Sequence, residues 1–216
     1  MSSSSPPLQP LLIDAPDRGV LFVVSGPSGV GKSTLITRAV KRVPGLSFSV
    51  SATTRAPRPG EVDGRDYQFM DIARFEALLA DGALLEHARV YDNYYGTLRS
   101  QVETTLAGGK SILLDIDVQG ARQVREGFPT AVHVFVVPPD LPTLERRLRR
   151  RNADPEQTIR RRMELAQEQL VDAALYDYIV VNGHLPTAQA VFEGVLLAAL
   201  HQRSRRESAL ERVVRT

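Results

Sequence analysis

The sequence predicts an α/β fold in which a parallel sheet is flanked by helices. Apolar, strand-like runs alternate with helix-like segments along most of the 216 residues, the order that places helices on the faces of a parallel sheet. The first strand-helix pair encloses residues 26–33, Gly-Pro-Ser-Gly-Val-Gly-Lys-Ser, which fit the pattern G-x-x-x-x-G-K-[ST] at every fixed position. With 43% hydrophobic residues, the chain can fill an ordinary core, so we expect one domain with small inserted subdomains.

Each element follows from a local pattern. Residues 20–25 are a continuous apolar run, typical of a strand buried on both faces, and residues 32–42 continue as an amphipathic helix. Gly108-Gly109 and Pro138-Pro139 end a helix and a strand, respectively. Further strands are predicted at 48–51, 67–70, 84–90, 111–115, 131–137 and 178–181, and further helices at 72–80, 100–107, 118–126, 141–150, 156–175 and 187–205. Residues 48–90 break the regular alternation, so they are expected to form a small inserted lobe.

Composition excludes several classes of protein. There is no cysteine, which excludes disulfides, thiolate chemistry and cysteine-based metal sites. No apolar run is long enough to span a membrane. Residues 1–18 begin with a Ser/Pro-rich stretch and are expected to be a disordered tail rather than a signal peptide. Residues 207–216 form a basic end. A cytoplasmic enzyme is the expectation.

The glycine-rich segment is a candidate site for a nucleoside triphosphate. Its glycines let backbone N–H groups point inward at a polyphosphate, and the start of the following helix adds positive potential. Lys32 is expected to reach the β- and γ-phosphates, and the Ser33 hydroxyl to bind Mg²⁺. The predicted ATP-binding residues of this segment are Gly26, Pro27, Ser28, Gly29, Val30, Gly31, Lys32, Ser33 and Thr34.

A phosphate-binding loop alone does not separate GTPases, ATPases and kinases. The guanine-reading Asn-Lys-x-Asp segment of GTPases does not occur, and the D-x-x-G match at residues 117–120 is weak because only two of its positions are fixed. Eight arginines lie between residues 146 and 162. They are consistent with a solvated helix face, a nucleic-acid patch or a clamp on phosphates.

The inserted stretch is more specific. It contains Ser51-Ala52-Thr53-Thr54-Arg55-Ala56-Pro57-Arg58-Pro59-Gly60-Glu61, Asp66-Tyr67-Gln68-Phe69, Leu85-Glu86-His87-Ala88 and Asn93-Tyr94-Tyr95-Gly96-Thr97, and Asp115-Ile116-Asp117-Val118-Gln119-Gly120 follows. In this order and spacing, the motifs closely resemble guanylate kinase from about residue 20 to residue 182. The resemblance implies a phosphate-binding-loop kinase core, a small mixed α/β lobe for the nucleoside monophosphate and a helical lid.

The resemblance implies roles for individual residues of the lobe. Those expected to hold the GMP phosphate are Arg55, Arg58, Tyr67 and Tyr95, and those expected to read the guanine are Ser51, Glu86, Thr97 and Asp115. Forked guanidinium groups and phenol hydroxyls suit a dianionic phosphate. Carboxylates suit the N1–H and N2–H₂ donors of guanine, whereas adenine would leave them unpaired. Taken singly, several of these residues have a plainer explanation. Arg55 and Arg58 could be solvated loop arginines, and Tyr67 and Tyr95 could be half-buried aromatic residues. Glu86 could be an outward-facing strand residue, and Asp115 could cap the next helix.

The lid and the adenine side are also carried over from the family. Arg147, Arg151 and Arg162 are expected to act on the transferring phosphoryl group together with Lys32 and Arg55. This chain has Arg149-Arg150-Arg151-Asn152 where the family often has Arg-Gly-Arg-Gly, and Asn182-Gly183-His184 where it has an acidic run. Asn182 is expected to contact the adenine edge. Asp115 and Asp117 are expected to orient Mg²⁺ through water.

The expected domain is therefore residues 19–206, divided into a core (19–50, 98–140 and 165–206), a GMP-binding lobe (51–97) and a lid (141–164). The implied reaction is ATP-dependent phosphorylation of GMP, and of dGMP, in purine nucleotide metabolism, with Mg²⁺ as cofactor. ATP and GMP are the expected partners, and neither nucleic acid nor a membrane is expected. The alternatives are a catalytically weak binding module of the same fold and a kinase for another phosphorylated small molecule.

Overall fold

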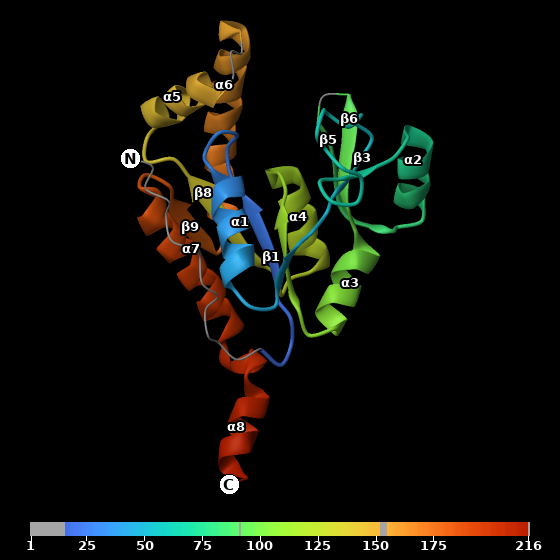
Figure 1. Cartoon of the computed structure of the whole chain (residues 1–216), viewed down its shortest axis with the longest axis vertical. Coiled ribbons are helices and arrows are strands. Elements are labelled where there is room, and N and C mark those ends of the chain that lie inside the picture. The colour runs from blue at the N-terminus through green and yellow to red at the C-terminus, as the bar shows by residue number, and fades with distance from the viewer. Residues whose placement is uncertain (1–15, 91, 152–154, 216) are drawn as a thin grey trace.

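The computed structural model describes residues 16–90, 92–151 and 155–215. Its larger sheet has five parallel strands in the order β2-β7-β1-β8-β9 (Figure 1). The strands are β1 (Leu21–Ser25), β2 (Leu46–Phe48), β7 (Ser111–Asp115), β8 (Val132–Val137) and β9 (Tyr178–Val181). Strand β1 is central and buried along its whole length. The parallel sheet and its helices confirm the predicted fold class.

Helices cover both faces of this sheet because the side chains of β1 alternate between two apolar clusters. Val20, Phe22 and Val24 pack in a cluster with α1 (Lys32–Arg42) and α7 (Leu185–Leu200). Leu21 and Val23 pack in the other cluster with α3 (Arg99–Ala107) and α4 (Val118–Gly127). The core therefore lies on both sides of β1, and the turn after β1 emerges at the carboxyl edge of the sheet, where ligands bind in this fold class.

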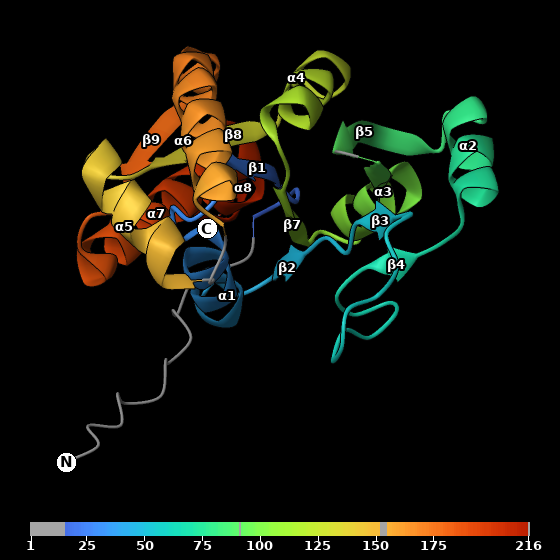
Figure 2. The same ribbon diagram turned by 90° about the horizontal axis from the view of Figure 1, so that it is seen from above.

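A second, smaller sheet is built from the inserted stretch. Its order is β4-β3-β6-β5, with β3 (Ala52–Thr53) parallel to β4 (Gln68–Phe69) and antiparallel to β6 (Asn93–Leu98), which pairs with β5 (Leu84–Val90). Helix α2 (Ile72–Ala80) packs on it through Phe75, whose ring stacks on Tyr94 with centroids 5.3 Å apart. Figure 2 shows this sheet and α2 beside the five-stranded sheet, with α4 between them.

Two further helices, α5 (Leu141–Arg151) and α6 (Glu156–Val171), stand over the carboxyl edge of the large sheet (Figure 1). Leu144 and Leu148 of α5 are buried in the same cluster as α1. Arg149 bonds Glu145 on its own helix and Glu156 on α6, at 2.8 and 2.7 Å. The bond between Arg149 and Glu156 connects the two helices.

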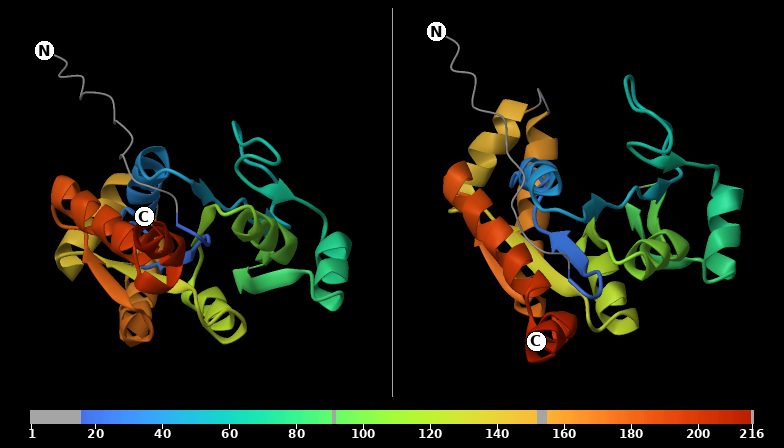
Figure 3. Two further views of the ribbon diagram at one scale, coloured as in Figure 1. Left: turned by 90° about the horizontal axis from the view of Figure 1, so that it is seen from below. Right: turned by 60° about the horizontal axis from the view of Figure 1, so that its bottom comes forward.

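The first described residues contact the C-terminal segment of the chain. After α6, the chain continues through η1 (Asp172–Leu175), β9, α7, η2 (Arg203–Arg205) and α8 (Glu207–Val214). Helix α8 extends away from the body (Figure 1) and is viewed nearly end-on from below (Figure 3, left). Asp17, at the end of the predicted tail, accepts a hydrogen bond from the Ser208 backbone at 2.8 Å and donates its own N–H to Arg205 at 2.9 Å. Among the described residues, no helix is long and apolar enough to cross a membrane.

Several element boundaries differ from the sequence prediction. Strand β6 was not predicted at all. The helix predicted at 156–175 ends at Val171 and continues as the 3-10 turn η1. The helix predicted at 187–205 is α7, which runs over Leu185–Leu200, and helix α8 was not predicted. Strand β2 lies at Leu46–Phe48 rather than 48–51. By contrast, α1, α2, β5, β7 and β9 have the predicted bounds.

Candidate functional site

The loop between β1 and α1 has the shape of a phosphate cradle. Gly31, at the N-cap of α1, has a φ of 98°, which an L side chain rarely adopts. A Cβ there would also lie 2.5 Å from the Asn182 side-chain nitrogen. Lys32 donates from Nζ to the Gly26 carbonyl at 2.7 Å and lies 3.7 Å from Asp115 Oδ1. The loop is thus held in a curled form, with its lysine folded back along it and beside a carboxylate.

Asn182 braces this loop from the end of β9. It is 5% exposed, and its side-chain amide donates to the Val30 carbonyl at 2.8 Å. Arg147 on α5 donates to the same carbonyl at 3.3 Å and to Gly183 at 3.4 Å. The bond between Asn182 and Val30 already uses the Asn182 amide nitrogen. A contact between Asn182 and adenine stays a prediction.

A cavity of about 270 Å³ opens between the two sheets. Six residues predicted for the nucleotide site line it: Ser51, Tyr67, Glu86, Tyr95, Asp115 and Asp117. Its volume is near the lower end of the range for small-molecule sites, about 300 Å³. The structure therefore brings together residues that lie up to 66 positions apart in the sequence, from the small sheet and from the end of β7.

Glu86 is the buried acid of this cavity. It is 4% exposed and accepts a 2.6 Å hydrogen bond from the hydroxyl of Thr97, which is itself fully buried. Burial raises the pKa of Glu86 from its ordinary value of 4.5 to about 7, the Thr97 bond lowers it, and the charge of Asp117 raises it. A carboxylate with few partners of its own is available to accept hydrogen bonds from a ligand.

Asp115 and Asp117 have distinct surroundings. Burial raises the pKa of Asp115, and Lys32 opposes that shift. Asp115 does not cap the next helix. The N-cap of α4 is Asp117, whose Oδ1 accepts the Gly120 N–H at 2.9 Å. Asp115 instead lines a cavity of about 350 Å³ together with Ser33.

The candidate phosphate end is built around Arg55. Its guanidinium lies 5.3 Å from the Tyr67 ring, whose centroid is 6.0 Å from that of Tyr95. Glu61 holds it: Oε1 accepts from Arg55 at 2.8 Å, and Oε2 accepts the Arg58 backbone N–H at 2.7 Å. The Arg58 side chain is exposed on the same loop. Glu61 is not among the predicted site residues, although it closes the motif that contains both arginines.

The remaining predicted residues are placed as follows. Ser33 and Thr34 are exposed on the first turn of α1, where Ser33 can reach a ligand at the loop. Arg162 is half-buried on α6. The Arg151 side chain and Asn152 lie outside the described part of the chain. In that part, no group of three or more His, Asp or Glu side chains could hold a metal by itself.

This donor set nevertheless fits Mg²⁺. The ion prefers oxygen ligands, and in kinase sites it is held by one or two protein oxygens together with substrate phosphates and water. The Ser33 hydroxyl and the Asp115 carboxylate face one cavity beside the loop. They would bind Mg²⁺ only together with phosphates, which agrees with a metal that arrives with a nucleotide.

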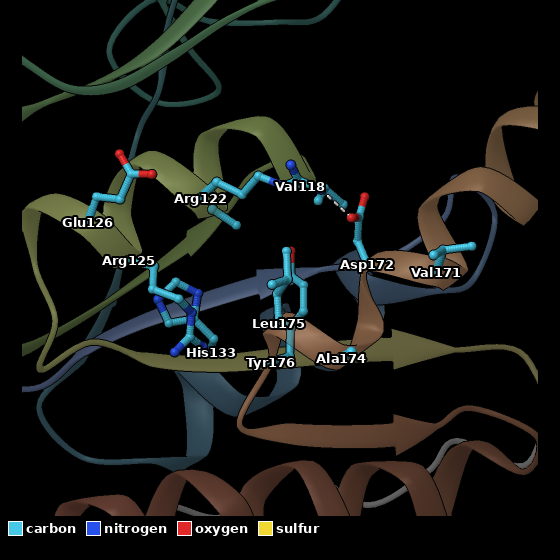
Figure 4. Close-up of a pocket in the computed structure, with 11 residues that line it drawn as sticks. Val118, Arg122, Arg125, Glu126, His133, Val171, Asp172, Ala174, Leu175 and Tyr176 are labelled. Atoms are coloured by element: carbon cyan, nitrogen blue, oxygen red, sulfur yellow. Dashed lines mark hydrogen bonds and ion pairs between the residues drawn. The ribbon is translucent and has the colours of Figure 1, made fainter.

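Another cavity, of about 410 Å³, lies between α4 and η1 (Figure 4). It is lined largely by apolar side chains and by Arg122, Arg125, His133 and Asp172. None of the predicted site residues lines it. The predicted site residues lie instead around the cavity between the two sheets and at the loop beside it.

Comparison with known proteins identifies the family. The guanylate kinase family model matches residues 18–199. The guanylate kinase of Bradyrhizobium diazoefficiens is 50% identical over 190 residues, 88% of this chain and 87% of that protein. That of Rhodospirillum rubrum is 46% identical over 213 residues, 98% of this chain and 97% of that protein.

Solved structures agree with this result. A crystal structure of guanylate kinase from Anaplasma phagocytophilum has a TM-score of 0.71 and 32% identity, covering 89% of this chain and 92% of that chain. The residues that the family model matches include both sheets and all the motifs quoted above. This chain belongs to the guanylate kinase family.

Proposed function

We propose that the loop binds ATP and that the cavity between the two sheets binds GMP, so that the two phosphate ends meet beside Lys32 and Asp115. The reaction of the family is ATP-dependent phosphorylation of GMP to GDP. The observation that supports this arrangement most directly is the shared position of Asp115. It lines the cavity that contains Glu86, and it lies 3.7 Å from the loop lysine.

Guanine recognition is proposed to rest on Glu86, Ser51, Thr97 and Asp115. An ionised Glu86 accepts from N1–H and N2–H₂, and Thr97 orients it. Adenine has no donor at either position, so it would leave a buried carboxylate unpaired, which binding sites penalise strongly. The same pocket suits dGMP, because none of these contacts uses the 2′-hydroxyl.

The phosphate of GMP is proposed to bind Arg55, Tyr67 and Tyr95, with Arg58 moving in from the surface. Lys32, Arg147, Arg151 and Arg162 are proposed to neutralise charge on the transferring phosphoryl group, since this chemistry depends on positioning and electrostatics. Mg²⁺, when bound by Ser33 with Asp115 and Asp117 nearby, would neutralise phosphate charge. A GMP oxygen attacks the γ-phosphorus in line, and ADP leaves; no covalent enzyme intermediate is needed.

The proposed division is a core (19–50, 98–140 and 165–206), a GMP-binding lobe (51–97) and a lid (141–164). What supports it is that residues 52–98 form their own sheet, and that α5 and α6 stand over the loop. The chain is proposed to act in the cytoplasm on these small molecules.

Equilibrium binding of GMP, IMP and AMP to the wild-type protein tests the guanine assignment. IMP keeps the N1–H donor of guanine but lacks the N2 amine. We expect affinity to fall in the order GMP, IMP, AMP. Equal affinity for all three would remove the proposed role of the carboxylates.

The raised pKa of Glu86 predicts a pH dependence for GMP. Only the ionised carboxylate accepts both guanine donors, so the Michaelis constant for GMP should rise as pH falls below about 7. The limiting slope is about tenfold per pH unit, or 1.36 kcal/mol. The constant for ATP should not follow this curve. Because the GMP phosphate itself gains a proton near pH 6, the profile of Glu86→Gln is the control, and it should lack the Glu86 component.

A further inference from the structure

Helix α4 contacts the small sheet at the strand that carries Glu86. That strand, β5, is the last in the order β4-β3-β6-β5, so one of its edges has no strand partner. Helix α4 packs against this edge, and Figure 2 shows it between the two sheets. Whatever fixes β5 against α4 also fixes Glu86 relative to the large sheet and its phosphate-binding loop.

The Gln123 side chain makes the backbone hydrogen bonds that a neighbouring strand would make at this edge. Its Oε1 accepts the His87 N–H at 3.0 Å, and its Nε2 donates to the His87 carbonyl at 2.7 Å. One side-chain amide therefore satisfies both backbone groups of the residue that follows Glu86. An unpaired backbone group at a half-buried edge is costly, which makes this pair of bonds specific for one position of β5.

Gly120, one turn earlier on α4, accommodates the Glu86 side chain. A Cβ built on Gly120 would lie 2.2 Å from Glu86 Oε2, far inside contact distance. The backbone here cannot easily retreat, because the Gly120 N–H is bonded to Asp117, the cap of the helix. The carboxylate therefore rests directly on the helix backbone.

The opposite face of α4 is anchored to the rest of the core. Arg122 pairs with Asp172 on η1 (Figure 4), and Arg125 pairs with Asp177 at 3.2 Å. Val118 and Ala121 line the apolar cavity on that side. These contacts fix one face of α4 to the core, so the opposite face can hold β5 in a constant position.

We propose that Gln123 and Gly120 are positioning residues for guanine recognition: they hold β5, and through it the Glu86 carboxylate, in register with the transfer site. This inference rests on the proposed role of Glu86. Neither residue needs to touch GMP. Their loss should weaken GMP binding while leaving the ATP site unaffected.

The first test replaces Gln123 with methionine, which has similar size and no hydrogen-bonding amide. We expect the Michaelis constant for GMP to rise about tenfold, because two hydrogen bonds that fix β5 are lost, with the constant for ATP unchanged. The matched control is Gln119→Met, on the same helix but exposed to solvent. It should change neither constant.

Amide hydrogen exchange at His87 gives a readout that does not depend on activity. In Gln123→Met, the His87 N–H loses its acceptor and should exchange at least about tenfold faster, while Gln119→Met leaves it unchanged. Unchanged exchange in Gln123→Met would show that the bonds do not hold β5. Faster exchange with an unchanged GMP constant would show that the contact does not position Glu86. Either result overturns the inference.

The second test is Gly120→Ala. Alanine favours helix over glycine, so without the Glu86 contact this change should be harmless or stabilising. We expect instead a rise of about tenfold or more in the GMP constant, and a smaller effect of the same change in a Glu86→Asp background, whose side chain is shorter. Equal effects in both backgrounds would overturn the steric contact. If Glu86→Gln alone leaves GMP unaffected, the proposed function fails, and His87 exchange still tests the contact itself.

Discussion

Replacing Lys32 with alanine is expected to lower turnover of GMP by roughly 10²–10³-fold or more, with GMP binding largely intact. Lys32 is the cation beside the loop, held by the Gly26 carbonyl at 2.7 Å and near Asp115 at 3.7 Å. In the transfer step it would neutralise charge that develops on the phosphoryl oxygens, and an alanine cannot do so. The proposed GMP site is the cavity between the sheets, which Lys32 does not line.

The measurement is kcat with saturating ATP and GMP, alongside equilibrium binding of GMP. Lys110→Ala, at an exposed position after α3, is the matched control and should retain full activity. Circular dichroism must show the same fold in each variant, because Lys32 also bonds the loop backbone. A folded Lys32→Ala protein with near wild-type kcat would refute the role of the loop lysine.

Replacing Glu86 with glutamine is expected to raise the Michaelis constant for GMP by roughly 10- to 100-fold, because a charge-assisted hydrogen bond is worth about 1.5–3 kcal/mol. Glutamine can still accept the Thr97 hydroxyl, but its amide end meets the guanine donors with a donor of its own. The proposed ATP site is the loop, so the Michaelis constant for ATP should stay unchanged. The effect is a change of specificity rather than a general loss of activity.

The same variant should be more stable without ligand. The pKa of Glu86 is raised on folding from 4.5 to about 7, so the folded state binds the proton more tightly than the unfolded state. Stability therefore falls as pH rises from 4.5 to 7, and the cost of the buried charge is complete above 7. Glutamine removes that cost, and we expect a gain of about 1–3 kcal/mol at pH 8.

Chemical unfolding at pH 8 and pH 5 checks this expectation, with Glu76→Gln, an exposed position on α2, as the control. The gain should be present at pH 8 and much smaller at pH 5. A variant that is destabilised at pH 8, or whose GMP and ATP constants both stay at wild-type values, would contradict the assignment of Glu86 as a buried, guanine-reading carboxylate.

Local sequence patterns predicted much of the core. Strand β7 ends at Asp115 as expected, because an apolar run followed by a carboxylate marks the end of a buried strand. The loop motif similarly located α1 at Lys32. Strand β6 was missed because Asn93-Tyr94-Tyr95-Gly96 mixes polar and aromatic residues with a glycine, and its stability comes from pairing with β3 and β5.

Long-range contacts could not be predicted from such patterns. The bonds of Gln123 to His87 join residues 36 positions apart, and the bond of Asn182 to Val30 joins residues 152 apart. A glutamine on a helix is normally solvated, so its type carries no signal. The family resemblance supplied the set of guanine-reading residues, but only the fold shows what holds them in position.

The most direct test of the account is an ADP-release assay with ATP, Mg²⁺ and, in turn, GMP, AMP, CMP and UMP. The account predicts rapid turnover with GMP and a kcat/KM for AMP lower by roughly 10⁴-fold. Comparable turnover of AMP or UMP would contradict a guanine-reading site built on Glu86. A protein that binds GMP but releases no ADP with any of the four would contradict the phosphoryl-transfer role of the loop and the lid arginines.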